Sequence, residues 1–274
     1  MYPDVTQTFA GLLTYYSKIK AEEINMNPFK QFSTFILFCL PNIVFAQDLP
    51  PANSLYVVTN CFLDEGINFD QALEEARGRY ENTESSPNLV FFRRPIAGTN
   101  NAPNQFYRIV SWDNMQHWNQ AVLQGNLSPT DLYECENQNR RFQSTRVVGL
   151  NLDTAYEDTD VAYVQARNCE VNPGISLSEV YTRVNRAVSE GQSERNADRT
   201  VAQLSNLILG GPDDDSAGLR VTIRRIGDSR EGFAEFFDEF YLGTEDRISG
   251  NDLLSCRPTQ MAESHVVHWK ARGI

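Results

Sequence analysis

Two stretches of the chain decide its fold: CFLDEGINFDQALEEARGRY at residues 61–80 and CEVNPGISLSEVYTRVNRAV at residues 169–188. Both begin with cysteine and carry Gly-Ile at the sixth and seventh positions. After that point the apolar residues follow the spacing i, i+3, i+4, i+7 and i+11, which is one face of an amphipathic helix. This self-similarity predicts a duplicated unit, in which a strand ends near each cysteine and a helix follows.

The start of each predicted helix carries a capping signal. Ser176 with Glu179 forms a capping box, and Asn68 with Gln71 forms a looser version of it. Gly191 is a typical residue for the end of the second helix. The two copies therefore agree in their local start signals as well as in their apolar pattern.

Downstream, the two copies keep the same order of segments. In each, Asn-Leu opens a short apolar run, and a loop rich in Gly, Asn, Asp and Pro joins this run to another strand. A second helix follows, then a cysteine, and then a closing strand. The matched segments are Asn88-Leu89 and Asn206-Leu207, the loops 97–105 and 210–218, the strands 106–111 and 221–226, the helical residues Trp118, Ala121 and Val122 against Phe233, Phe236 and Phe237, and the closing strands 146–149 and 265–269.

This order of elements predicts an α+β fold made of two tandem repeats. A ferredoxin-like β-α-β-β-α-β unit forms a four-stranded antiparallel sheet with two helices on one face. The other face of each sheet remains apolar, so we expect the two sheets to pack together as a pseudo-dimeric α+β barrel. We place the first repeat at residues 47–151 and the second at 158–274, with the acidic stretch 152–160 joining them.

Four cysteines lie within the repeats, and four cysteines allow three disulfide connectivities. In the expected topology the first and last strands of a repeat are neighbours that run in opposite directions. This arrangement favours Cys61–Cys135 and Cys169–Cys256, one disulfide per repeat, over pairing between the repeats. Closing such long loops would stabilise each copy by roughly 4–5 kcal/mol in the chain-entropy model.

The segment MNPFKQFSTFILFCLPNIVFA, residues 26–46, has the layout of a secretory signal peptide, with Val44 and Ala46 in the cleavage register. Its apolar run is shorter than the ~20 residues that span a bilayer and contains Pro41, so we expect no stable membrane insertion. Residues 1–25 precede a good internal start and are expected to be a non-native upstream extension. The expected location is periplasmic or extracellular, where disulfides form.

Charge and composition exclude some classes of function. A formal net charge of −12 argues against a sequence-independent nucleic-acid binder and against docking on an anionic lipid surface. Hydrophobic residues at 41% and charged residues at 22% are close to globular averages, so the chain has enough apolar material for a core.

The segment YRIVSWD, residues 107–113, followed by a helix through Trp118, resembles the third strand and second helix of the dimeric α+β barrel superfamily, which includes the antibiotic-biosynthesis monooxygenase-like domains. The resemblance implies a tandem fusion that encloses a pocket between its sheets. The sequence does not reproduce a complete catalytic signature of that group.

Residues present in one copy alone are candidates for function. Trp112 and His117 have no equivalents in the second copy, where Gly227 and Gly232 stand. With the neighbouring aromatic residues they form the predicted pocket, which comprises Tyr107, Trp112, His117 and Trp118. His117 is of the residue type that can shuttle a proton or ligate a haem or metal, although a half-exposed histidine on an amphipathic helix is the simpler interpretation.

Other candidate groups favour structural explanations. His265 and His268, three apart in a strand, would point to opposite faces and could not bind one metal ion. The run 213–215 lacks the spaced ligands of a calcium loop. The pairs Arg93-Arg94 and Arg224-Arg225 could orient an anionic ligand, but they are expected to be surface ion-pair partners. We expect no metal site and no cofactor.

The sequence leaves three functions open. The first is an exported binding or interaction module that holds a small apolar or aromatic ligand between its sheets. The second is a cofactor-independent monooxygenase-like or haem-handling enzyme with Trp112 and His117 at its site. The third is a structural envelope component without a ligand. No signature of a serine hydrolase, phosphate-binding loop, zinc protease or dithiol motif occurs in the sequence.

Overall fold

In the computed structural model of the protein, Gln47–Ile274 form one compact unit. The structure describes residues 49–98, 101–123, 130–150, 159–195, 200–210, 219–227, 229–230, 233–234 and 252–272. The predicted signal peptide and upstream extension lie outside the described residues. Within the described residues, no helix is long and apolar enough to cross a membrane.

The strands and helices of the first half follow the predicted order, with two additional short elements, β4 (Tyr133–Cys135) and the 3-10 helix η1 (Asn137–Asn139). The first half contains β1 (Ser54–Leu63), α3 (Phe69–Arg77), β2 (Leu89–Ala97), β3 (Gln105–Trp112), α4 (Met115–Leu123), β4, η1 and β5 (Arg141–Val148). The second half contains β6 (Val161–Val171), α5 (Leu177–Arg195), β7 (Thr200–Leu209), β8 (Arg220–Gly227), β9 (Leu254–Cys256), β10 (Gln260–Trp269) and the 3-10 helix η3 (Lys270–Arg272).

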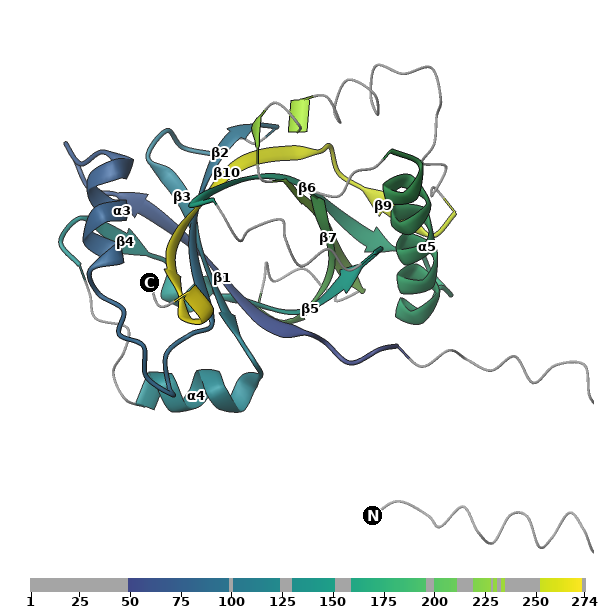
Figure 1. The fold of residues 1–274 in the computed structure, drawn as a ribbon, viewed down its shortest axis with the longest axis horizontal. Coiled ribbons are helices and arrows are strands. Elements are labelled where there is room, and N and C mark those ends of the chain that lie inside the picture. Colours follow the sequence, from purple (N-terminus) through teal and green to yellow (C-terminus); the bar gives the residue numbers. More distant parts are fainter. Residues whose placement is uncertain are drawn as a thin grey trace, which may run out of the picture. The chain divides into compact units, whose positions relative to one another are not determined.

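Eight strands close into an antiparallel barrel, and Figure 1 looks into it. The order is β10-β2-β3-β1-β5-β7-β8-β6, and pairing of β6 with β10 completes the circle. The first half runs β2-β3-β1-β5 and the second runs β7-β8-β6-β10, so both halves place their strands in the same order. The last strand of each half pairs with the second strand of the other, β5 with β7 and β10 with β2.

Both predicted disulfides, Cys61–Cys135 and Cys169–Cys256, are confirmed. The short strands that carry the second cysteines were not predicted. β4 pairs with the end of β1 so that Cys61 lies opposite Cys135, and β9 pairs with β6 in the same way. Each disulfide therefore joins directly facing residues of neighbouring strands.

Two glycines lie where the halves meet. Gly98 follows β2 with φ 74°, and Gly210 follows β7 with φ 78°, a left-handed region that favours glycine. A Cβ on Gly98 would collide with the carbonyl oxygen of Thr259, and a Cβ on Gly210 would collide with that of Arg140. Thr259 and Arg140 precede the closing strands of the opposite halves, so both seams of the barrel depend on the same close backbone approach.

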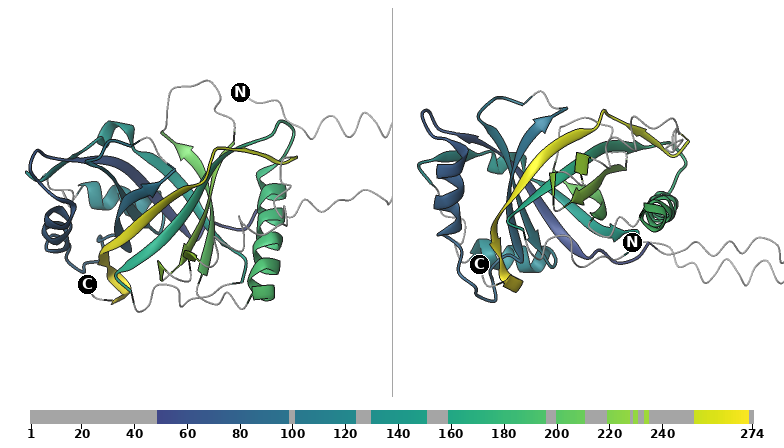
Figure 2. Two further views of the ribbon diagram at one scale, coloured as in Figure 1. Left: turned by 90° about the horizontal axis from the view of Figure 1, so that it is seen from above. Right: turned by 45° about the horizontal axis from the view of Figure 1, so that its top comes forward.

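The helices cover the outside of the barrel (Figure 2). α3 and α4 pack on the first half, and α5 packs on the second through its apolar stripe. The capping box at Asn68 is formed, with Asn68 and Gln71 each hydrogen-bonded to the backbone of the other. Glu179 and Ser176 make the equivalent exchange at the start of α5. The second helix predicted for the second copy was placed on Phe233, Phe236 and Phe237. Phe236 and Phe237 lie outside the described residues.

The register corrects one predicted match. Leu89 pairs with Ser111 at the start of β2, whereas Asn206 pairs with Val221 near the end of β7. The strand β7 begins at Thr200, because an apolar pattern already starts there, so Asn88-Leu89 and Asn206-Leu207 are not equivalent. By contrast, Trp112 and Gly227 hold the same register position opposite the first strand of each half, as predicted.

Candidate functional site

The barrel wall has an inner face and an outer face, because successive side chains of a strand point in opposite directions. On the inner face of the barrel wall lies an apolar cluster, separate from the core under the helices. Its members come from four adjacent strands and include Tyr56, Val58, Leu89, Phe91, Tyr107, Ile109, Val266 and Trp269. Aromatic side chains therefore line one side of the barrel interior.

The facing side of the interior carries a group of polar residues beside a smaller apolar cluster. Arg224 of β8 is 4% exposed and donates hydrogen bonds to Ser205 Oγ and Gln143 Oε1, both at 2.5 Å. Its guanidinium also lies 5.9 Å from the ring centroid of Tyr56. Gln203 Nε2 donates to the Tyr56 hydroxyl at 3.0 Å. We call these residues, Tyr56, Gln143, Gln203, Ser205 and Arg224, the inner polar cluster.

Inside the barrel, Gln203 Oε1 and Ser264 Oγ are buried and have no hydrogen-bond partner within the described part of the chain. Gln203 is 7% exposed and Ser264 is 1% exposed. An unmade hydrogen bond at a buried polar group costs about 1–3 kcal/mol, so native structures seldom leave such atoms without a protein, water or ligand partner. The barrel interior therefore presents hydrogen-bonding capacity beyond what its own fold uses.

A second group of polar residues lies at the barrel rim. Arg141 donates to Asn60 Oδ1 at 2.9 Å, and its guanidinium stands 5.9 Å from the ring centroid of Tyr107. Burial lowers the pKa of the Arg141 guanidinium, while Tyr107 and Glu136 act in the opposite sense. In the second half, Asn168 accepts from Thr222 at 2.9 Å. Asn60 and Asn168, which precede the first cysteine of each half, thus tie the first strand of that half to a neighbouring strand.

The structure separates the four residues of the predicted pocket. Tyr107 belongs to the inner apolar cluster, whereas Trp112 lies on the outer face, where His117 and Trp118 of α4 pack. Trp112 and His117 meet edge-on at a centroid distance of 5.1 Å, and Trp118 packs against Phe142. The two environments lie on opposite sides of the barrel wall.

His117 is buried and firmly oriented. Its Nδ1 lies 3.0 Å from a carboxylate oxygen of Asp113, and its backbone N–H donates to Asn114 Oδ1. Its Nε2 has no hydrogen-bond partner among the described residues, and the same holds for the indole Nε1 of Trp112. A carboxylate that holds one ring nitrogen and leaves the other available is typical of ligating or acid–base histidines.

The two histidines of β10 depart from the prediction. A β-bulge between Val266 and His268 shifts the register, so both His265 and His268 lie on the outer face. His265 packs against Phe69, and His268 stacks on Tyr80. Burial raises the pKa of Tyr80, and burial raises that of nearby Tyr133 to about 12. Across the described ranges, no group of three or more His, Cys, Asp or Glu residues could hold a metal ion.

In each of the two arginine pairs, one residue lies on the inner face of the barrel wall and the other on the outer face. Arg93 and Arg224 lie on the inner face, in register with Ser264 and Gln203, while Arg94 and Arg225 point outward. Arg94 forms an ion pair with Glu263, as the surface prediction expected of these pairs. Arg93 and Arg224 are buried, at 7% and 4% exposure, contrary to that prediction.

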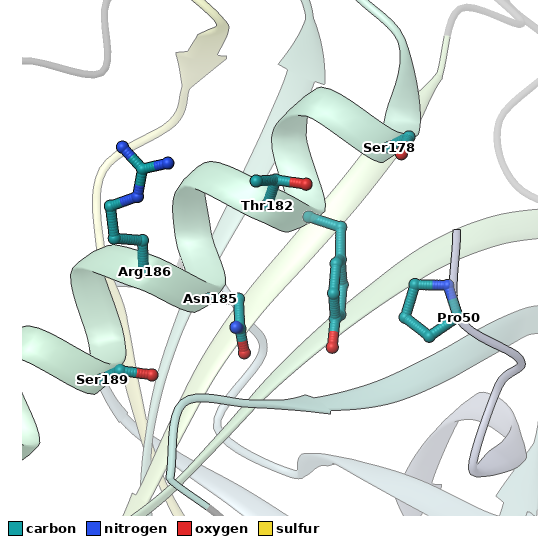
Figure 3. A pocket seen from close by; sticks show the side chains of 7 residues that line it. Pro50, Ser178, Thr182, Asn185, Arg186 and Ser189 are labelled. Carbon is teal, nitrogen blue, oxygen red and sulfur yellow. The ribbon is translucent and has the colours of Figure 1, made fainter. Parts of the chain in front are cut away.

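A groove of about 580 Å³ runs along one face of α5, opposite Pro50 (Figure 3). Arg146 donates to the Pro50 carbonyl at 2.6 Å and fixes that segment. Small polar residues at helical spacing leave the groove open. They are Ser178, Thr182, Asn185 and Ser189, with Tyr181 and Arg186 beside them. This stripe has no further feature that marks it as a ligand site.

Sequence reasoning missed the inner polar cluster. Gln203 and Ser205 alternate with the apolar residues Ala202 and Leu204, which is the pattern of a half-exposed strand. Barrel closure converts the polar side of that pattern into interior. The sequence signal that was available is the spacing of Gln203 and Ser205, which stand two residues apart and so share one face of their strand.

No family model and no curated protein matches the chain. Solved structures with similar folds include a candidate monooxygenase from Fusobacterium nucleatum, 10% identical, which covers 79% of this chain and 94% of that one with a TM-score of 0.47. An anthrone oxidase-like protein is 11% identical over 81% and 93% with a TM-score of 0.45. The encapsulated DyP-type peroxidase of Mycobacterium smegmatis is 10% identical over 81% and 95%, with a TM-score of 0.45. Likeness at this level does not extend to chemistry.

Proposed function

We propose that this protein is an exported binding module that holds a small aromatic ligand inside its barrel. The observation that carries the proposal is the pair of buried, unpartnered atoms on the inner face, Gln203 Oε1 and Ser264 Oγ. An eight-stranded barrel has room for packed side chains or for one small ligand. Polar groups inside a barrel with one aromatic side are the combination that orients and shelters such a ligand.

The proposal includes a tandem origin of the barrel. Two ferredoxin-like halves, joined by the acidic stretch 152–160, would form the pseudo-dimer within one chain. The identical strand orders, the matched disulfides and the equivalent positions of Gly98 and Gly210 support this view. Two disulfides also favour an oxidising compartment, in keeping with the predicted export signal.

Intrinsic fluorescence offers a direct test, because the chain has three tryptophans and Trp269 alone belongs to the inner cluster. In a variant with Trp112→Phe and Trp118→Phe, the neutral probe N-phenyl-1-naphthylamine should quench Trp269 emission to saturation. The matched Trp269→Phe protein, which keeps the two outer tryptophans, should show little quenching. Absence of saturable quenching, or equal quenching in both proteins, would exclude a ligand inside the barrel.

A second candidate function is haem handling at His117. It is favoured by the Asp113-oriented ring whose Nε2 is buried without a hydrogen-bond partner among the described residues. The donor fits a single axial ligand to haem iron, which would supply redox chemistry when bound. The edge-on ring of Trp112 occupies the space beside the imidazole, so a flat group could enter only if α4 moved away from the sheet.

Titration with haemin separates the two candidates. A shift of the Soret band that disappears in His117→Ala and weakens in Asp113→Asn would support haem binding on the outer face. If the Soret band does not shift, or if His117→Ala leaves its shift unchanged, the second candidate fails. The Trp269 experiment is independent of that result, because Trp269 and His117 lie on opposite sides of the wall.

A further inference from the structure

We infer that the outer face of the first half binds a small tetrahedral oxyanion, such as phosphate or sulfate, between Arg108 and Arg140. The inference does not depend on a ligand inside the barrel, because Arg108 points away from the interior. It alternates in β3 with Phe106 and Val110, which both belong to the core under the helices. Arg140 lies between η1 and β5. Both side chains donate to one neutral acceptor, and this convergence carries the inference.

The side chain of Asn137 brings the two guanidiniums together. Arg108 Nη2 donates to Asn137 Oδ1 at 3.2 Å, and Arg140 Nε donates to the same oxygen at 3.3 Å. Two positive charges therefore meet on a group that carries no charge of its own. Burial lowers the pKa of the Arg140 guanidinium, and the charge of Arg108 lowers it further. Like charges this close repel, and an anion placed between them turns the repulsion into attraction.

The carboxylates of neighbouring elements have other partners. Glu136 accepts a hydrogen bond from Asn60 Nδ2 at 3.0 Å. Glu75 of α3 forms an ion pair with Arg79. Within the described part of the chain, neither arginine of the converging pair forms an ion pair with a carboxylate. The counter-charge for the pair is therefore left to a ligand.

Two tyrosines lie close enough to Arg108 for its charge to act on them, Tyr80 and Tyr133. Burial raises the pKa of both phenols, that of Tyr133 to about 12, so both stay neutral and add no negative charge near neutral pH. Arg108 Nε is buried and has no hydrogen-bond partner among the described residues. This guanidinium thus keeps hydrogen-bonding capacity that its surroundings do not use, which favours a charge-assisted bond to an oxyanion.

The two arginines stand on backbone that is already fixed. Arg108 belongs to β3, which is paired on both sides by β1 and β2. The carbonyl oxygen of Arg140 lies against Gly210 at one seam of the barrel. Guanidinium forks on a fixed backbone lose little conformational freedom when they bind an oxyanion. The net charge of −12 opposes the approach of a polyanion, so the pair suits a single small dianion.

Thermal unfolding with added phosphate tests the site, because a ligand of the native state raises the melting temperature. The apparent affinity for phosphate should fall about 10- to 100-fold in Arg140→Gln, the range expected for the loss of a charged hydrogen bond. Arg183→Gln is the matched control, since it removes an exposed arginine that is paired with Asp252. This control should bind phosphate as the parent does. It also retains the general stabilisation by excluded salt, which all variants share.

Equal responses of the parent and Arg140→Gln would overturn the inference. If Arg140→Gln fails to fold, equilibrium dialysis of labelled phosphate against the unmodified protein decides. One phosphate should bind per chain, sulfate should displace it, and chloride at equal ionic strength should not. A parent that binds no phosphate and loses stability on Arg140→Gln without added anion would assign the counter-charge to the chain's own acidic run 213–215, and the inference would fail.

Two further probes identify the source of the oxyanion. If glycerol 3-phosphate binds more tightly than inorganic phosphate, the site belongs to a phosphate group carried on an organic ligand. Equal or weaker binding of the ester assigns the site to the free ion. Heparin that binds more tightly than either probe would reveal an extended surface for a polyanion and would overturn the inference of a single-anion site.

Discussion

Gly98 and Gly210 occupy the same position in the two halves of the barrel, and each lies against a backbone carbonyl of the opposite half. Both adopt positive φ, and both end the second strand of their half just where the closing strand of the other half begins. Because the contact is between backbones, no rotation of a side chain can relieve a methyl group added there. The two seams are thus intolerant of an added side chain at these positions.

Replacing either glycine by alanine should destabilise the protein by about 2–4 kcal/mol, which combines the cost of a left-handed residue with that of overpacking. Chemical denaturation of Gly98→Ala and Gly210→Ala measures it. Gly191→Ala is the control, since Gly191 lies in α5 with no atom within 4 Å of the added Cβ. That variant should be stabilised by about 0.5–1 kcal/mol. Seam variants as stable as the parent would contradict the proposed closure.

Removal of one disulfide should destabilise the protein without preventing the other disulfide from forming. The two bridges enclose sequence separations of 74 and 87 residues, so each contributes about 4–5 kcal/mol in the chain-entropy model. Cys61→Ser with Cys135→Ser should lower the melting temperature, and dithiothreitol should lower it again by opening Cys169–Cys256. If the reductant has no further effect on the double variant, the second bridge does not stabilise the native fold.

Tyr56→Phe tests the inner polar cluster. It removes the acceptor for Gln203 Nε2 and leaves both polar atoms of that buried amide without a partner, so we expect a loss of about 1–3 kcal/mol in unfolding free energy. Adding Gln203→Met should recover most of the loss, because an apolar side chain needs no partner. Tyr163→Phe, on the outer face of β6, should change stability by less than about 0.5 kcal/mol. Additive losses in the double variant would refute the coupling.

The free energy of unfolding should fall as the pH drops from neutral, because His265 takes up a proton more readily in the unfolded state. Burial lowers the pKa of His265 below its ordinary value, although Glu263 acts against this shift. The folded state therefore binds fewer protons than the unfolded state near pH 6.5 and below, and the stability present at higher pH is lost on acidification. Denaturation of the parent between pH 7.5 and 5.5 should show the decline, and His265→Phe should flatten it. An unchanged slope in the variant would assign the effect to another group.

At lower pH a second group acts in the same direction. Burial alone would raise the pKa of Glu263, but the hydrogen bond and charge of Arg94, together with His265, hold it below the usual range. Its contribution is present above the unfolded pKa and is lost as the pH falls through the folded one. Arg94→Met should therefore reduce stability at neutral pH and shrink the further loss on acidification below about pH 4.5.

The sequence predicted the α+β class, the pairing of the first and last strands of each half and both disulfides, because these follow from periodicity, caps and cysteine spacing. The position of Gln203 inside the barrel could not be foreseen in this way. Its surroundings are set by Tyr56 and Arg224, which come from distant strands and meet it only on closure. The outward placement of His268 had a local cause, the bulge after Val266, for which the sequence gives no turn residue as a signal.

The predicted pocket failed as a single group for a simple geometric reason. Tyr107 and Trp112 stand five apart in one strand, and residues separated by an odd number point to opposite faces. Parity alone therefore assigns Tyr107 to the interior and Trp112 to the helix side. The uniqueness of Trp112 and His117 to the first copy remains a sound observation, and the structure gives it a buried, Asp113-oriented histidine.

The closing strand of each half pairs with the second strand of the other half, and this sets the order in which the barrel can assemble during synthesis. As the chain emerges, β1 to β5 form a sheet whose free edges, at β2 and β5, find partners only after β7 and β10 have appeared. Each disulfide, in contrast, lies within one half and can be oxidised without the other. The first half can thus form its disulfide while the edges of its sheet are still unpaired and able to pair with other chains. Before β10 has been synthesised, the chain is therefore most in need of a chaperone.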